Sequence, residues 1–292
     1  MRTKGEKTFD IINIVLMALF CLMIIYPVWN TVVISLNDAT DAMMGGLYWW
    51  PRKFSLESYK TVLETPGIFK AFGVTVAKTV VGVITHVLFT AMVAYGLSKR
   101  DLVGRKLYLT VGVITMFFNG GLIPNYLLIR NLGLLDNFMV YIIPALFSFF
   151  DLIIFQSFFR ELPASLEESA FIDGANEFQI FLKIILPLSM PVMATIALFN
   201  GVYQWNDFFT GIIYINNPDL QPIQTFLYKV IVQNSSSQML SAMPAAVTNL
   251  AKTTSESIKL ATMVIATLPI VLVYPFLQKY FVKGILLGSV KE

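Results

Sequence analysis

Four carboxylates stand close together in a sequence that is otherwise poor in charge. Glu167, Glu168, Asp173 and Glu177 fall within LEESAFIDGANEFQIFLKIILP, residues 166–187, whose last residues begin another apolar run. From its charges, a polar, glycine-broken segment of this kind is a solvated connector between two apolar segments. Composition alone does not assign it a further role.

Catalytic and metal chemistry have little support in the sequence. The chain contains one cysteine, Cys21, and one histidine, His86, so it cannot build a disulfide framework, a zinc site or a Cys/His nucleophile pair within itself. It holds no G-x-x-x-x-G-K-[ST] phosphate loop, no H-E-x-x-H and no G-x-S-x-G. We therefore assign no catalytic residues and no metal ligands, and the chain cannot hydrolyse ATP by the phosphate-loop route.

Lys, His and Asp side chains lie inside apolar stretches at four positions, Lys78, His86, Asp151 and Lys279. Such groups are rare there and usually paired or functional, and Lys279 is near the inner end of its stretch, where its ammonium can reach the cytoplasmic headgroups. Lys78 lies about two turns from the outer end of its stretch, so we expect its ammonium to reach outward to the membrane surface. His86 and Asp151 lie deeper. They could form a proton relay, a gate contact or a hydrogen-bonded packing pair, and packing is our default interpretation.

Composition places the chain in a membrane. Its 292 residues are 56% hydrophobic and only 13% charged, whereas soluble domains contain about 25% charged residues. The formal net charge of +3 comes from 21 basic and 18 acidic residues that form no continuous basic face, so we expect no nucleic-acid partner. The sequence predicts an all-α integral membrane protein.

Six stretches are apolar and long enough to cross a hydrocarbon core of about 30 Å as helices. They are residues 11–36, 71–97, 107–129, 138–159, 184–205 and 260–282. Gly120, Gly121 and Pro124 should break the third stretch near its outer end. The first stretch follows basic residues as a secretory signal does, but it is long and lacks a small-residue cleavage site, so we expect it to be retained. The chain is then one transmembrane domain, 1–292.

Basic residues in the short loops predict the orientation, because cytoplasmic loops carry an excess of Lys and Arg. The loop 98–106 contains four such residues, whereas 130–137 contains only Arg130. Both termini and the loop 161–183 are therefore predicted to be cytoplasmic. The outer side receives the two long loops, 37–70 and 206–259.

The acidic loop has the sequence pattern of two short helices. Ser165 followed by Glu168 has the spacing of a capping box, which would start the first helix. Asp173 and Gly174 should end it, because glycine adopts positive φ without strain. Residues 176–186 resume a helical pattern. We expect two helices bent about a glycine, with an acidic tip.

This loop resembles the EAA loop of ABC importer permeases, whose pattern is Glu-Ala-Ala, a glycine four residues later and then Ile-x-Leu-Pro. The matching residues are Glu168, Ala170, Gly174, Ile184, Leu186 and Pro187, and Ser169 replaces the first alanine. Four further stretches are similar to the carbohydrate-uptake branch, in particular to the smaller permease of the maltose-type importer: SLESYKTVL (55–63), GGLIPNYLLIRNLGLLDN (120–137), YQWNDFFTGIIY (203–214) and QKYFVKGILLGSVKE (278–292). The second of these looks closest to permeases for complex or uronate-containing oligosaccharides.

The resemblance implies a type I ABC importer permease fold and a non-catalytic subunit that forms half of a translocation pathway for an oligosaccharide. The implied partners are a second permease subunit, two cytoplasmic ATPase subunits that bind ATP and Mg, and an external solute-binding protein. The implied location is a bacterial plasma (inner) membrane, crossed several times. The implied ATPase-docking residues are Glu168, Ser169, Ala170, Asp173, Gly174 and Ala175. Glu168 would pair with a basic residue of the ATPase.

Amide and aromatic residues gather at the outer half of the fifth predicted span, namely Asn200, Tyr203, Gln204 and Asn206, with Trp205 among them. Amides and aromatic rings can bind the hydroxyls and apolar faces of a sugar in a translocation pathway. They also join neighbouring helices in membrane bundles, and Tyr203 and Trp205 could be interfacial anchors. The alternative function is an ion-coupled secondary transporter that uses Asp151 and His86 and needs no docking loop.

Overall fold

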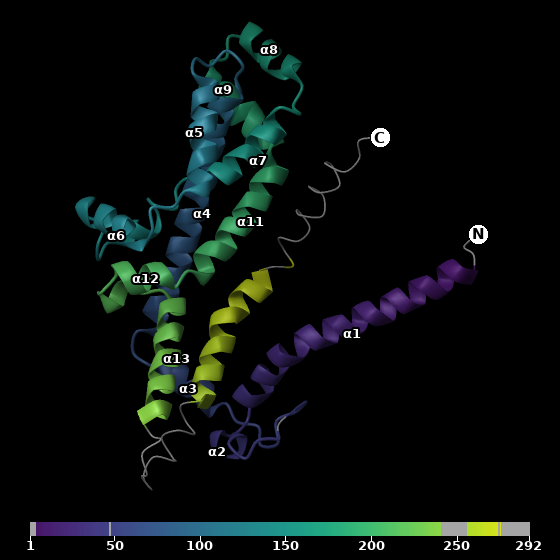
Figure 1. Ribbon diagram of the computed structural model, residues 1–292, viewed down its shortest axis with the longest axis vertical. Coiled ribbons are helices and arrows are strands. Elements are labelled where there is room, and N and C mark those ends of the chain that lie inside the picture. The colour runs from purple at the N-terminus through teal and green to yellow at the C-terminus, as the bar shows by residue number, and fades with distance from the viewer. Residues whose placement is uncertain (1–3, 47, 241–255, 274, 276–292) are drawn as a thin grey trace. The chain divides into compact units, whose positions relative to one another are not determined.

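The structure is a computed structural model, and it describes residues 4–46, 48–240, 256–273 and 275. These residues form helices and turns with a single isolated bridge, from Asn37 to Phe54, and no strand, which confirms the predicted all-α architecture for this part of the chain. Figure 1 labels the helices in chain order. The chain divides into two compact units, Met1–Ile68 with Leu227–Leu268 and Phe69–Phe226 with Pro269–Glu292.

The first unit begins with a long apolar helix. Its elements are α1 (Lys4–Ser35), α2 (Ala39–Ala42), α3 (Glu57–Glu64), most of α13 (Ile223–Leu240) and most of the helix Glu256–Val273. The most apolar window of α1 is 0% buried. An apolar helix this exposed needs lipid or another protein around it. Beyond α1, Trp49 and Trp50 are exposed and pack edge-to-face against Tyr26 and Trp29.

The second unit contains the remaining described helices. They are α4 (Ile68–Ser98), α5 (Arg105–Phe117), α6 (Leu122–Asn131), η1 (Phe138–Tyr141), α7 (Phe149–Phe159), α8 (Ala164–Ile172), α9 (Glu177–Ile180), the π-helical turn η2 (Phe181–Ile185), α10 (Leu186–Leu188), α11 (Met190–Asn206), α12 (Phe209–Tyr214) and η3 (Pro218–Leu220). One buried cluster contains Ala91 and Ala94 of α4, Phe155 of α7, Ile180 near the end of the acidic loop and Ile185 just after it. Small residues such as these alanines let helices approach closely.

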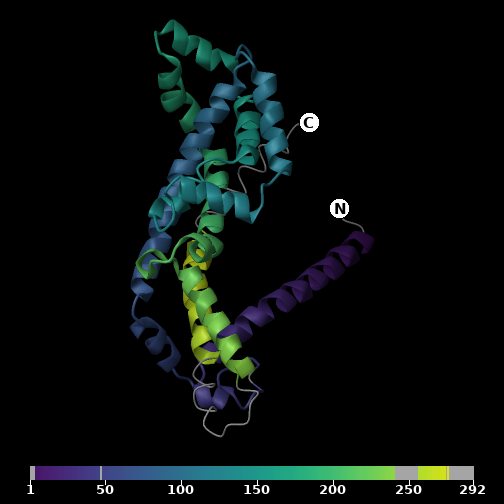
Figure 2. The same cartoon turned by 60° about the vertical axis from the view of Figure 1, so that its left-hand side comes forward.

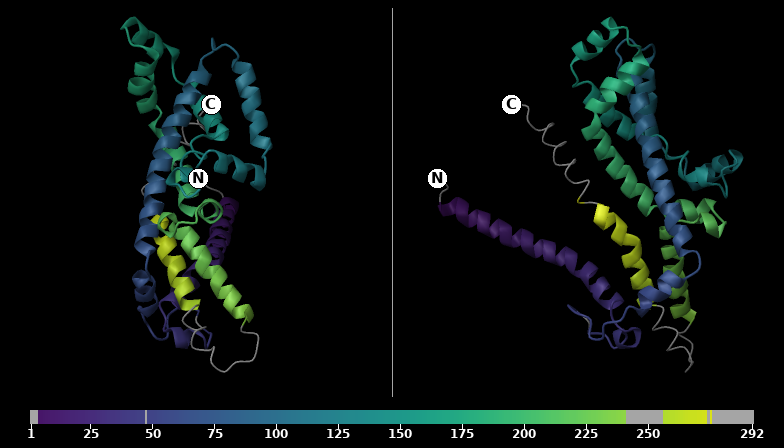
Figure 3. Two further views of the ribbon diagram at one scale, coloured as in Figure 1. Left: turned by 90° about the vertical axis from the view of Figure 1, so that its left-hand side faces the viewer. Right: turned by 180° about the vertical axis from the view of Figure 1, so that it is seen from behind.

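Some of the predicted spans are straight and others are bent. Three described helices are long and apolar enough to cross a membrane, Gly5–Ser35, Ile68–Ser98 and Glu256–Val273. The pair Arg105–Phe117 and Leu122–Asn131 passes the same test together but bends by 119° (Figure 3). Gly121 takes φ 85 at this bend, which confirms the predicted break near Gly120 and Gly121. The sixth predicted span is described only as far as Val273, apart from residue 275.

A second bend was not predicted. Glu177–Leu188 and Met190–Asn206 meet at 78°. Ser189 leaves helical geometry between them, with φ −93 and ψ 8, and Pro187 and Pro191 flank it. A proline cannot donate the backbone hydrogen bond that would continue a helix. The two prolines therefore account for a break at the start of the fifth predicted span.

The prediction of one continuous helix over 138–159 is wrong. The segment holds the short turn η1 and then the eleven-residue helix α7. Eleven residues rise only about 16 Å, half of a hydrocarbon core. Pro144 interrupts the segment, and the Ser148 hydroxyl accepts a hydrogen bond from the Asp151 N–H at 3.3 Å, so the helix begins at Phe149.

Candidate functional site

The acidic loop folds as two helices joined at a glycine. Helix α8 ends at Ile172 with Asp173 as its C-cap, and Gly174 follows with φ 82, which confirms the predicted helix–glycine–helix pattern. The capping box predicted at Ser165 is wrong, since Pro163 precedes the first residue of α8 and Ser165 lies inside the helix. Proline has the φ that a helix start requires, which explains the earlier start. The capping box instead joins Asn176 and Gln179 at α9.

The loop has one buried and one exposed face. Ala170 of α8 lies in the buried cluster, as do Ile180 and Phe181 at the other end of the loop. Among the predicted docking residues, Ala175 is half-buried, and the exposed ones are Glu168, Ser169, Asp173 and Gly174. Ala170 therefore packs against the buried cluster of the second unit. Figure 1 shows α8 and α9 at the end of the unit reached by the C-terminal end of α4.

Apolar side chains lie on the exposed face of the same loop, and sequence analysis missed their importance. Ile172 is 87% exposed, Phe178 60% and Phe171 44%. Exposed apolar groups among carboxylates are typical of a surface that a protein partner covers. The signal in the sequence was the Phe-Ile pair directly before Asp173, which a purely solvated connector would not need.

A polar cavity of about 440 Å³ lies among α4, the segment 140–151 and α11. Asn200, Tyr203 and Gln204, three of the four residues predicted to lie in a substrate pathway, line it. The buried Asn200 Oδ1 has no hydrogen-bond partner among the described residues, so it offers a free acceptor. Gln204 Nε2 donates to the carbonyl of Tyr141 at 3.1 Å and thus joins two segments. Asn206 lies away from the cavity, where its Nδ2 donates to the carbonyl of Val202.

His86 and Asp151 form a direct pair at the wall of this cavity. The distance from His86 Nε2 to Asp151 Oδ2 is 2.9 Å, and that from His86 Nδ1 to the carbonyl oxygen of Ala145 is 2.7 Å. A carbonyl can only accept, so Nδ1 carries a hydrogen. The His86 side chain is buried and joins α4 to the segment around α7. Of the three roles left open by the sequence, the contacts support the packing pair.

The prediction that Lys78 reaches the membrane surface is wrong. Its side chain is 0% exposed. Lys78 Nζ donates to the carbonyl of Asp207 at 3.0 Å and to its Oδ2 at 3.1 Å, and it lies 4.8 Å from the ring centroid of Tyr141. Asp207 also accepts from the N–H of Thr210 at the start of α12. The counter-charge is 129 residues away along the chain, so no local pattern could indicate it.

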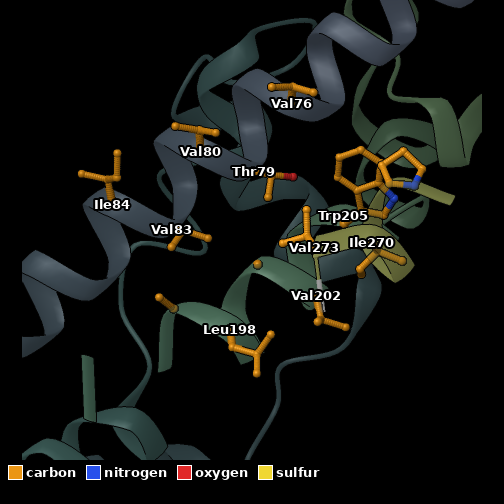
Figure 4. Close-up of a pocket in the computed structure, with 13 residues that line it drawn as sticks. Val76, Thr79, Val80, Val83, Ile84, Leu198, Val202, Trp205, Ile270 and Val273 are labelled. Carbon is orange, nitrogen blue, oxygen red and sulfur yellow. The ribbon is translucent and has the colours of Figure 1, made fainter. Parts of the chain in front are cut away.

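A second cavity, of about 540 Å³, is almost wholly apolar. Valine, isoleucine and leucine side chains of α4, of α11 and of the segment 269–273, which belongs to the second unit, line it (Figure 4). Trp205 lies in its wall and is buried, so the interpretation of Trp205 as an interfacial anchor is wrong. Sugar hydroxyls need polar partners, so the first cavity suits a carbohydrate and the second does not.

Comparison with known proteins identifies the family. Residues 1–287 match the family described as binding-protein-dependent transport system inner membrane component, and the chain belongs to this family. It is 40% identical over 291 residues to the polygalacturonan/rhamnogalacturonan transport system permease protein YtcP of Bacillus subtilis strain 168, covering 98% of this chain and 99% of that protein. It is 42% identical over 294 residues to Protein LplC of the same organism, covering 99% and 97%.

Among solved structures, the chain resembles one from a bacterial ABC transporter involved in the import of the acidic polysaccharide alginate. The TM-score is 0.86 at 30% identity, over 96% of this chain and 99% of that one. These likenesses confirm the predicted resemblance to sugar-uptake ABC permeases. Binding-protein-dependent transport also argues against the ion-coupled alternative.

Proposed function

We propose that the chain is the membrane-spanning, non-catalytic subunit of an ATP-driven importer and forms half of its pathway for an acidic oligosaccharide. The observation that carries the proposal is likeness over nearly the full chain length to two proteins named for uronate polymers, the polygalacturonan/rhamnogalacturonan permease and the alginate importer. A more distant relative, 28% identical, is named for arabinooligosaccharides, which are neutral. Charge is therefore the property of the substrate that most needs a test.

The proposed assembly supplies the ATP-binding subunits that a chain without a phosphate-loop motif needs, and its other partners are those expected for the family. ATP and Mg are bound by two cytoplasmic ATPase subunits, a second permease completes the pathway, and an external solute-binding protein delivers the sugar. The chain crosses the bacterial plasma (inner) membrane six times, with both termini and the loop 161–183 in the cytoplasm. The exposed face of α8, with Glu168 and Ile172, docks on an ATPase, and closure of the ATPases tilts the spans from inward-open to outward-open.

The broken fourth span supports a pathway at the polar cavity. Non-helical backbone at membrane depth is tolerated only where it is buried in protein or lines a water-filled cavity. Tyr141, Pro144 and Ser148 belong to the non-helical part of 138–148 or its edges, and all three line the polar cavity. We therefore place the sugar pathway along this cavity, with Asn200 as a hydrogen-bond acceptor for a sugar hydroxyl.

Uptake by the assembled importer tests this proposal. The chain is purified with its co-purifying subunits, reconstituted in liposomes that enclose ATP on the ATPase side, and supplied with its solute-binding protein. We expect ATP-dependent uptake of oligogalacturonides and little uptake of arabino-oligosaccharides of equal length. Preference for the neutral sugar would contradict the assignment of an acidic substrate. Uptake that a protonophore abolishes while ATP persists would contradict ATP-driven import itself.

A further inference from the structure

Two carboxylates of the acidic loop, Glu167 and Glu177, pair with a lysine outside the loop. Glu167 of α8 accepts a hydrogen bond from Lys99 Nζ through its Oε2, and Glu177 Oε2 of α9 lies 3.2 Å from the same Nζ. The Tyr95 hydroxyl donates to Glu177 Oε2 at 2.9 Å, and Lys99 Nζ lies 4.3 Å from the Tyr95 ring centroid. One lysine therefore joins the end of α4 to both helices of the loop. Figure 2 shows α8 and α9 at the same end of the second unit as the C-terminal end of α4.

The last turns of α4, which directly precede Lys99, are held in place by contacts with other helices. The Tyr95 ring stacks on Phe181 with centroids 5.3 Å apart and meets Phe159 edge-on at 6.2 Å. The carbonyl of Leu97, in the last turn of α4, accepts hydrogen bonds from Arg105 Nε at 2.8 Å and from Gln156 Nε2 at 2.7 Å. These bonds join the C-terminal end of α4 to α5 and α7. Lys99 is the residue directly after α4, so its position is fixed by the same bonds.

Apart from this pair, helix α8 is little buried against the rest of the second unit. Of its residues, only Ala170 is buried and only Glu167 is half-buried, while the rest are exposed. On the other side of Gly174, Ile180 and Phe181 anchor the second helix in the buried cluster. The pair between Lys99 and Glu167 is therefore the polar tether of the helix that carries Glu168 and Ile172.

The electrostatics keep this tether charged. Burial alone would lower the pKa of Lys99, but its interactions with Glu167, Tyr95 and Glu177 outweigh burial and raise the pKa above its ordinary value. An isolated pair at a surface contributes little to stability. This cluster differs because Lys99 and Glu167 are partly withdrawn from solvent, which reduces screening of their pair by salt, and because the same ammonium also lies next to the exposed Glu177 on a separate helix.

We propose that Lys99 is a positioning residue that fixes α8 and α9 against the end of α4, so that movement of the docked loop is passed to the second span. Without Lys99, movement of the docked loop bends the chain at Gly174 and does not move the second span. This inference rests on the proposed function, since it assigns a route for motion that the ATPase supplies. It adds an element outside the loop, and no contact between Lys99 and the ATPase is required.

The assembled importer in liposomes tests the tether. With Lys99→Met, we expect subunits that still co-purify, ATP hydrolysis that continues, and sugar uptake per ATP that falls about tenfold, a typical size for coupling between sites. The charge swap Lys99→Glu with Glu167→Lys, made together with Glu177→Gln so that the new carboxylate does not face Glu177, should restore most of the uptake per ATP. It rebuilds the pair with its charges reversed. The exposed Lys106, in the first turn of α5, is the matched control, and Lys106→Met should leave this ratio unchanged.

The possible results distinguish the proposed role of Lys99 from the proposed docking of the loop on the ATPase. Unchanged uptake per ATP in Lys99→Met, while Glu168→Ala with Gly174→Val uncouples the importer, would contradict the tether alone. Unchanged coupling in both would contradict the docking role of the loop as well. Failure of the charge swap to restore uptake, or failure of both Lys99 variants to assemble, would also overturn the proposal, because a positioning role requires an assembled complex that responds to the reversed pair.

Discussion

The double variant Glu168→Ala with Gly174→Val is expected to uncouple ATP hydrolysis from sugar uptake by the importer. Gly174 has φ 82, a conformation that costs other residues about 1–2 kcal/mol and β-branched residues more. The space around Gly174 is open, with no heavy atom within 4 Å of an added Cβ, so valine strains the turn without a clash. The turn should then open and carry α8 off its docking position, and Glu168→Ala removes the carboxylate proposed to pair with the ATPase.

The measurement is ATP hydrolysis in liposomes with and without sugar-loaded binding protein. We expect the stimulation to fall by more than about tenfold in Glu168→Ala with Gly174→Val, which is a loss of coupling and not of assembly. Gly133→Val is the matched control, because Gly133 also has positive φ, 69, and open space around it, but lies in the turn after α6. Strong stimulation in the double variant would contradict the docking assignment.

Removing the buried ammonium of Lys78 should destabilise the chain far more than removing an exposed one. Asp207 is 10% exposed and loses its counter-charge in Lys78→Met, and breaking a buried pair on one side costs about 3–5 kcal/mol. Lys70 and Asp219 form the matched exposed pair, at 2.8 Å with exposed fractions of 65% and 63%. Lys70→Met should change the unfolding free energy by about 1 kcal/mol or less.

Thermal unfolding of the purified chain in detergent distinguishes these variants. We expect a large drop in the midpoint for Lys78→Met, almost none for Lys70→Met, and partial recovery when Asp207→Asn is added to Lys78→Met. The recovery follows because the second change removes the unpaired buried charge, while an asparagine oxygen can still accept from Thr210. Equal midpoints for the Lys78 and Lys70 variants would show that the pair does not contribute as its burial indicates.

Local patterns predicted the parts of the structure that depend on local chemistry. The helix–glycine–helix loop follows from Gly174, and the bend of the third span follows from Gly120 and Gly121, because glycine needs no distant partner to adopt positive φ. The capping box shows the limit of this reasoning. Ser165 and Asn176 both have the right spacing, and the proline before α8 determined that only Asn176 caps a helix.

Long-range pairing accounts for what the sequence did not predict. Lys78 and Asp207 are 129 residues apart, and Lys99 and Glu167 are 68 apart, so no spacing rule joins them. The amide side chain marked Gln204 as a candidate, and Gln204 does line the polar cavity. Its hydrogen bond joins α11 to the carbonyl of Tyr141, and any residue at position 141 would supply that carbonyl, so the sequence gives no sign of it. Sequence could therefore nominate side chains for the site without assigning their partners.

The central claim is that the acidic loop faces the cytoplasm, where an ATPase can reach it, and site-directed labelling tests this most directly. Cys21 is the single cysteine and is exposed, so it is first replaced by serine. Ser169→Cys and Asn216→Cys then report on the two sides, since both positions are exposed. The account predicts that a membrane-impermeant maleimide labels Ser169→Cys only in inverted vesicles and Asn216→Cys only in right-side-out vesicles. Labelling of Ser169→Cys in right-side-out vesicles would contradict it.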